Sequence, residues 1–149
     1  MLQLKILYIC IIIMGNTRFA TAIHIMTLLA KVPQEWLTSE WIAGSINVNP
    51  VIVRKELKEL RNAGLIISRL GKEGGTRLSK SAEDIKISEI YAAVKNDEVL
   101  GKKNQKPNPV CPVGKEINSH LLLLFDATEQ LVRDFLGNKS LQEFADQFD

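Results

Sequence analysis

Side chains that could contact a polyanion are concentrated between residues 16 and 82 of this 149-residue chain. That stretch carries ten basic and five acidic residues, a balance of +5, whereas residues 83–149 have a balance of −4 and the whole chain only +2. A local excess of positive charge is typical of a surface that binds nucleic acid. The charge distribution therefore favours a polyanionic partner for the first half of the chain.

The most informative basic residues are Arg54, Lys55 and Lys58, which follow Asn49-Pro50-Val51. Asn is a preferred N-cap and Pro suits the first helical position, so a helix should begin here. In the major groove, the planar guanidinium of Arg54 could contact both acceptors of a guanine. Lys55 and Lys58 suit phosphates, which supply affinity and salt dependence.

Two further groups extend the predicted DNA-binding surface, although each basic residue could instead be an ordinary solvated one. Free amides at the start of a helix opened by Thr38 and Ser39 can receive a phosphate. A glycine-rich turn flanked by basic residues would let the backbone approach a groove. The full predicted set is Thr38, Ser39, Asn49, Pro50, Val51, Arg54, Lys55, Lys58, Arg69, Lys72, Gly74, Gly75 and Arg77.

Hydrophobic periodicity predicts the elements that must position these residues. Two short helices joined by a tight turn form a helix-turn-helix, and the β-branched and glycine-rich segments after it predict a hairpin, or wing. The predicted elements are helices at 17–31, 39–46 and 50–63, a hairpin at 65–78, and helices at 85–94, about 112–137 and 140–148.

In the last long helix, a mainly apolar series repeats at spacings of 4, 3, 4, 3 and 4, as in the seam of a coiled coil: Ile117, Leu121, Leu124, Thr128, Leu131 and Phe135. Such a rod is long for one small chain to cover, so we expect it to pair two subunits. Packing onto the first domain of the same chain is the alternative. The predicted dimerisation residues are Ile117, Leu121, Leu124, Leu131 and Phe135.

The expected fold is mainly α with a small β-hairpin wing. It comprises a winged helix-turn-helix domain at 16–96, a loop at 97–111, and the dimerisation helix with a short C-terminal helix at 112–149. Residues 1–15 include an apolar run that could be a signal or anchor, an extra packed segment, or translation from an early start. We expect an early start, with Met14 as the natural initiator, because the amphipathic pattern begins only after it.

Cys10 and Cys111 are too few for a disulfide scaffold, which favours a reducing, cytoplasmic setting. Cys111 precedes Pro112 at a predicted helix start, where the helix dipole lowers a thiol pKa and Lys115 adds to the effect. Cys111 is therefore either an inert cysteine or a redox sensor. The chain has no recognisable catalytic motif, and GKEGG lacks the spacing of a phosphate-binding loop.

The strings RFATAIHIMTLLA, TSEWIAGSINVNPVIVRKELKELRNAGLI and GKEGGTRLSKSAEDIKISEIYAAV resemble the winged-helix domain of the Rrf-two family of bacterial transcription regulators. The resemblance continues to the C-terminus, and NPNPVCPVGKEI is most similar to the YwnA-like branch. It implies a homodimer that binds a palindromic operator. Family members that hold an iron-sulfur cluster carry three cysteines before the long helix, and one group has a histidine where Gly114 stands here.

Because only Cys111 remains in that loop, we expect no cofactor, and neither His24 nor His120 replaces the missing ligands. The predicted function is a cytoplasmic, sequence-specific DNA-binding regulator, a homodimeric repressor without enzymatic activity or a membrane partner. Its partner is double-stranded DNA, and its signal is either oxidation of the thiol or an unknown small molecule bound between the winged domain and the long helix. The alternative is a winged-helix module that binds proteins.

Overall fold

The computed structural model describes residues 2–96 and 98–148, with side chains from residue 17 onward. It confirms the expected fold class: a mainly helical chain whose described residues form one two-stranded antiparallel sheet. The elements are α1 (Leu2–Lys31), α2 (Ser39–Ile46), α3 (Pro50–Asn62), β1 (Ile66–Arg69), β2 (Gly75–Leu78), the 3₁₀ helix η1 (Ala82–Asp84), α4 (Ile87–Val94), α5 (Pro112–Gly137) and α6 (Leu141–Ala145).

The helix-turn-helix is defined by its caps. The Thr38 hydroxyl accepts a hydrogen bond from the Trp41 amide at 3.2 Å, and the Asn49 side chain accepts one from the Val51 amide at 2.9 Å. Between the helices, Asn47 adopts the left-handed conformation with φ 60°, which asparagine tolerates better than most residues. The side chains of Thr38 and Asn49 satisfy amides at the starts of α2 and α3, so residues close in sequence determine the tight turn.

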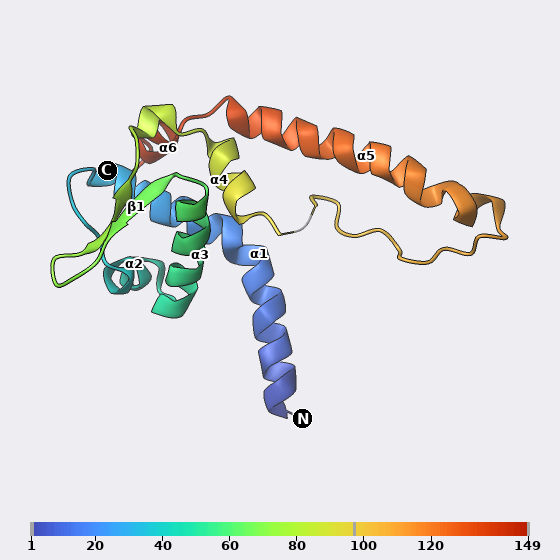
Figure 1. Ribbon diagram of the computed structural model, residues 1–149, viewed down its shortest axis with the longest axis horizontal. Helices are drawn as coiled ribbons and strands as arrows, with labels where there is room; N and C mark the ends of the chain where they lie inside the picture. Colours follow the sequence, from blue (N-terminus) through green and yellow to red (C-terminus); the bar gives the residue numbers. More distant parts are fainter. Residues whose placement is uncertain (1, 97, 149) are drawn as a thin grey trace.

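The core lies where α1, α3 and α4 meet, with α2 and the hairpin packed around it. Its largest fully buried apolar side chains are Ile25, Met26, Leu29, Ile42, Val53, Leu60, Ile66, Ile85, Ile90, Val94 and Leu141. In Figure 1, the loop at 98–111 runs outward from this winged domain and α5 returns alongside it, so that the two project together. After α5, α6 packs against α1 and η1. The Leu141 amide there donates to the Ile85 carbonyl at 2.8 Å.

Three helix boundaries differ from the sequence prediction. The predicted start of the first helix at Thr17 is wrong, because α1 begins at Leu2: residues 2–14 contain no proline or glycine, and the single Gly15 does not interrupt the helix. Helix α4 begins at Ile87 rather than 85, because Ser81 caps a separate 3₁₀ turn first. Helix α6 ends at Ala145, short of the predicted 148.

The early-start hypothesis for residues 1–15 stays a prediction, and the side chains of residues 1–16, including Cys10, lie outside the described residues. No helix among the residues that the structure describes is both long and apolar enough to cross a bilayer.

Candidate nucleic-acid interface

Helix α3 presents a basic face to solvent. Its other face is fixed in the core by Val53 and Leu60, which are fully buried. Val51 is 64% exposed, and Arg54, Lys55 and Lys58 are exposed as well. The apolar spacing of α3 thus orients its polar residues outward, as a helix that enters a groove requires.

A hollow of about 440 Å³ lies between the start of α2, α3 and the hairpin. Its lining brings together these predicted residues: Thr38, Ser39, Arg54, Arg69, Lys72, Gly74 and Gly75. The remaining predicted residues lie outside that lining: Asn49, Pro50, Val51, Lys55, Lys58 and Arg77. The hollow also contains Glu40 and Arg61, which the sequence prediction did not include.

Glu40 forms an ion pair with Arg54 across the two helices of the helix-turn-helix. The Arg54 Nη2 donates to Glu40 Oε1, and the Ser39 hydroxyl donates to Glu40 Oε2 at 3.1 Å. The hydrogen bond from its own backbone amide, then those from Arg54 and Ser39, hold the pKa of Glu40 below the ordinary glutamate value. From the sequence, Glu40 is recognisable only as an acidic residue in the first turn of α2, so the pairing with Arg54 could not be predicted.

Two wing arginines stack on Trp36, another residue missing from the sequence prediction. The guanidinium carbons of Arg69 and Arg77 lie 4.6 and 4.5 Å from the centroid of the Trp36 ring. Arg69 also donates from Nε to the Glu73 carbonyl at 3.1 Å. The indole therefore limits the freedom of both cations, since cation–π contacts favour this geometry. A tryptophan directly before the buried Leu37 gave no sequence signal for this role.

Gly74 and Gly75 have an intramolecular role in folding the wing. A Cβ on Gly74 would lie 2.2 Å from the Arg69 carbonyl oxygen, and one on Gly75, at φ 153°, would lie 2.8 Å from that of Leu37. Leu37 and Thr76 exchange backbone hydrogen bonds of 3.0 and 2.8 Å. The absent side chains thus allow the hairpin to pack against its own chain, and their approach to a DNA groove stays a prediction.

A buried ion pair fixes α3 from the inner side. Arg18 Nε donates to Glu56 Oε1 and Oε2 at 2.8 and 3.1 Å, and its Nη2 donates to Oε2 at 3.0 Å. Arg18 also contacts Asn96 through Nη1. The hydrogen bond from Arg18 to Glu56 raises the pKa of Arg18, against the opposing effect of burial. Removing this pair from the charge count of residues 16–82 leaves the excess of +5 unchanged.

Helix α5 contacts α4 along one face and leaves its predicted seam largely uncovered. Phe125 is buried, while Leu124, Leu131 and Phe135 on the seam are 56, 70 and 64% exposed. Ile117 and Leu121 are half-buried.

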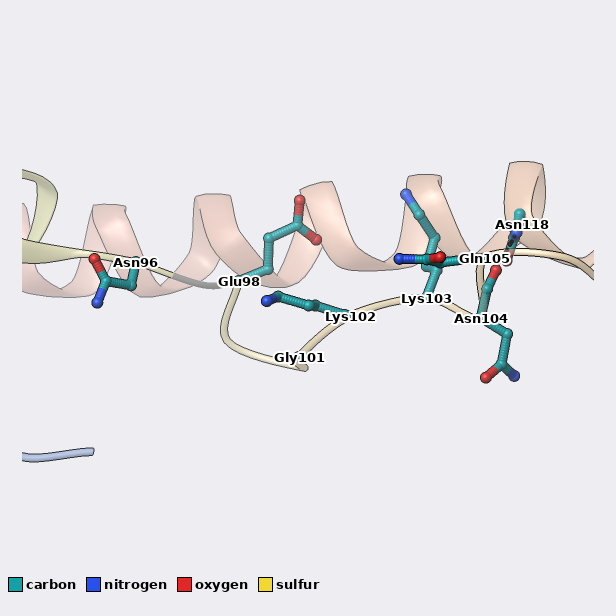
Figure 2. A pocket seen from close by; sticks show the side chains of 8 residues that line it. All are labelled: Asn96, Glu98, Gly101, Lys102, Lys103, Asn104, Gln105 and Asn118. Carbon is teal, nitrogen blue, oxygen red and sulfur yellow. Dashed lines mark hydrogen bonds between the residues drawn. The ribbon is translucent and has the colours of Figure 1, made fainter. Parts of the chain in front are cut away.

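An open hollow of about 450 Å³ lies between residues 98–105 and α5. Figure 2 shows its lining residues, which are all polar or glycine: Asn96, Glu98, Gly101, Lys102, Lys103, Asn104, Gln105 and Asn118. The Asn118 side chain donates to the Asn104 carbonyl at 2.8 Å and ties the loop to the helix. Cys111, the N-cap of α5, is exposed and does not line this hollow.

Comparison with known proteins identifies the fold. Residues 15–147 match the Rrf2 (Rrf-two) family, which is described as an iron-dependent transcriptional regulator. The chain belongs to the Rrf2 family. Over 130 residues, this Rrf2 chain is 40% identical to YwnA of Bacillus subtilis (strain 168), which is named as an HTH-type transcriptional regulator. The aligned region covers 87% of this chain and 96% of YwnA.

Solved structures agree with this assignment. A crystal structure described only as that of a DNA-binding protein has a TM-score of 0.68 at 36% identity, covering 85% of the Rrf2 chain and 97% of that protein. CymR of Staphylococcus aureus has a TM-score of 0.64 at 28% identity, and the match covers 89% of the Rrf2 chain and 98% of CymR. The expected family and the winged-helix architecture are therefore confirmed.

The side chains that the structure describes do not fit the iron that the family description implies. Cys111 is the one cysteine among them, and the described residues contain no group of three or more His, Cys, Asp or Glu that could hold a metal ion. His24 hydrogen-bonds Ser45 at 3.2 Å and His120 lies 3.8 Å from Glu116, so neither histidine joins Cys111. A single thiolate does not complete the usual ligand set of a cluster.

Proposed function

We propose that this Rrf2 chain is a homodimeric repressor that binds a palindromic operator in the cytoplasm and has no enzymatic activity. The observation that carries the proposal is the position of Arg54, exposed on α3 and beside a hollow that the wing arginine Arg69 also lines. Arg54 is proposed to contact a guanine in each half-site, and Lys55 and Lys58 to contact phosphates. The exposed α5 seam is proposed to pair the subunits.

The test is footprinting on DNA upstream of the gene, followed by salt titration of binding to the protected fragment. A phosphate-binding surface predicts that affinity falls steeply as salt rises. Arg54→Ala should relax discrimination at one position per half-site, whereas Lys58→Ala should weaken binding to all sequences alike and reduce the salt slope by about one. If no DNA is protected and the affinity for DNA does not change with salt, the result would instead favour a protein-interaction module.

The signal is proposed to be a small polar molecule bound in the open hollow between residues 98–105 and α5, with oxidation of the Cys111 thiol as the alternative. Its volume of about 450 Å³ is in the range of small-ligand sites. Footprinting in parallel with reductant and oxidant separates the two proposals. Protection that persists under oxidant, and is the same in Cys111→Ser, would exclude Cys111 as the sensor.

A further inference from the structure

The pair formed by Glu40 and Arg54 lies on the exposed face of the helix-turn-helix. The two side chains are 61% and 54% exposed, and Figure 1 shows α2 and α3 together at one end of the winged domain. An ion pair this exposed contributes little to folding, because water screens it and two long side chains lose freedom. The carboxylate gains some stability from its position in the first turn of α2, but the ion pair adds little to it and so does not account for the pairing with Arg54.

A carboxylate in this position opposes binding to DNA in general. It lies within a domain whose net charge is +5, on the side expected to face phosphates, and it repels them. It also engages one of the five N–H groups of Arg54, which would otherwise be free to pair with any nearby phosphate. The Ser39 hydroxyl and the backbone amide of Glu40 itself hold the carboxylate in place.

The same contact favours one specific geometry. A guanidinium held by a carboxylate on one edge keeps its remaining N–H groups in a fixed plane, which suits the two acceptors of guanine. At a site without that guanine, Arg54 stays paired with Glu40 and the carboxylate still repels the backbone. Glu40 therefore weakens binding to wrong sequences more than binding to the right one.

We propose that Glu40 is a specificity-determining residue, which positions Arg54 for guanine and penalises DNA that lacks it. This inference rests on the proposed function. It adds a residue that acts by positioning Arg54 and by repelling the DNA phosphates. In the free protein the carboxylate is ionised at neutral pH, because hydrogen bonds lower its pKa.

The matched control is Glu83→Gln. Glu83 is an exposed carboxylate of η1, which packs on α6 at the other end of the winged domain from α2. Glu40→Gln and Glu83→Gln each remove one negative charge from the full-length protein. Only the first removes the partner of Arg54. Any difference between the two variants therefore reports position and not net charge.

The experiment measures the dissociation constant of each variant at several salt concentrations. Three DNAs are used: the footprinted operator, the operator with single guanines replaced by adenine, and an unrelated fragment. Glu40→Gln is expected to tighten binding to the unrelated fragment and to lower the ratio of specific to unspecific affinity about tenfold, within the range for one base contact. Glu83→Gln should leave that ratio unchanged. Thermal melting of both variants checks that they fold like the wild type.

Adding Arg54→Ala provides the second measurement. If Glu40 acts through Arg54, Glu40→Gln should no longer alter discrimination at the guanine position once Arg54 is absent. Equal behaviour of Glu40→Gln and Glu83→Gln on all three DNAs would overturn the proposal. The proposal would also be overturned if Glu40→Gln altered discrimination at the guanine position just as strongly in the Arg54→Ala background. Failure of the wild type to distinguish operator from unrelated DNA would overturn the proposed function itself, which is a separate result.

Discussion

Three arginines of the winged domain illustrate how position decides the chemistry of one residue type. Arg18 is buried against Glu56, Arg54 is exposed and paired with Glu40, and Arg69 is stacked on Trp36. In the sequence all three count equally toward a positive surface. Arg54 and Arg69 are exposed, as the proposed DNA contacts require, whereas buried Arg18 holds α3 in place.

Breaking the buried pair from its acidic side should destabilise the fold. Glu56→Gln leaves Arg18, 8% exposed, as a buried cation without its carboxylate. The expected loss is about 3–5 kcal/mol of unfolding free energy, measured by equilibrium denaturation in urea. Glu73→Gln, at an exposed position in the wing, is the control and should change stability by less than about 0.5 kcal/mol. A loss below about 1 kcal/mol for Glu56→Gln would show that the pair is not structural.

At the scale of elements, the sequence was most informative where local chemistry sets a boundary. Thr38, Asn49 and Pro50 mark the starts of α2 and α3, because capping depends only on neighbours along the chain. Helix α1 was misjudged because an apolar run that looks like a separate segment is also a good helix former. The amphipathic pattern shows which face of a helix is apolar, but it does not show whether the helix extends into the apolar run before it.

The candidate site was predicted only in part, for a physical reason. The basic residues of α3 and the wing were found because each has a recognisable type and position. The contacts of Glu40 with Arg54 and of Trp36 with the wing arginines join residues far apart in sequence. They depend on tertiary packing, which leaves no periodic signal. Similarly, Gly74 lies between the two strands as predicted, whereas Gly75 is the first residue of β2, and the atoms that a side chain at either position would meet could not be predicted.

The attachment of α5 to α4 should weaken in acid. Burial raises the pKa of Glu129, but Lys95 at 2.7 Å, the Tyr91 hydroxyl at 3.2 Å and the nearby charge of Arg133 lower it more. A folded pKa below the unfolded one means that the ionised carboxylate stabilises the fold above the ordinary glutamate pKa. This contribution disappears as the pH falls through the lower, folded value.

Urea denaturation at a series of pH values tests this expectation with Glu129→Gln. At neutral pH the variant should be less stable than the wild type by about 1 kcal/mol, the typical net contribution of one intramolecular hydrogen bond. The difference should shrink as both proteins are taken below the ordinary glutamate range, because the wild-type carboxyl is then protonated. Exposed Asp126→Asn on the same helix is the control. A difference that stays constant with pH would mean that the ionisation of Glu129 does not stabilise α5.

For the whole molecule, one helix projects from a small domain and carries apolar side chains that the chain itself leaves uncovered. The winged domain buries its own core, whereas the seam residues Leu124, Leu131 and Phe135 are more than half exposed. Monomeric proteins seldom leave such a continuous apolar stripe in water. The proposed dimer would cover the stripe and present two positively charged domains together, which would account for the division between a +5 domain and a −4 region.

An aspartate in this stripe should dissociate the dimer without unfolding the winged domain. Leu131 is 70% exposed within one chain, so Leu131→Asp costs little in the monomer but buries a charge in a paired seam. Leu122 is 43% exposed and lies nine residues earlier, about two and a half turns, on the opposite side of α5. Leu122→Asp is therefore the matched control.

Sedimentation should give a monomer for Leu131→Asp and a dimer for both Leu122→Asp and the wild type. Loss of tight binding to the full operator should accompany dissociation, because a single winged domain contacts only one half-site. A wild type that is monomeric at all concentrations, or a Leu131→Asp variant that remains dimeric, would exclude the seam as the interface.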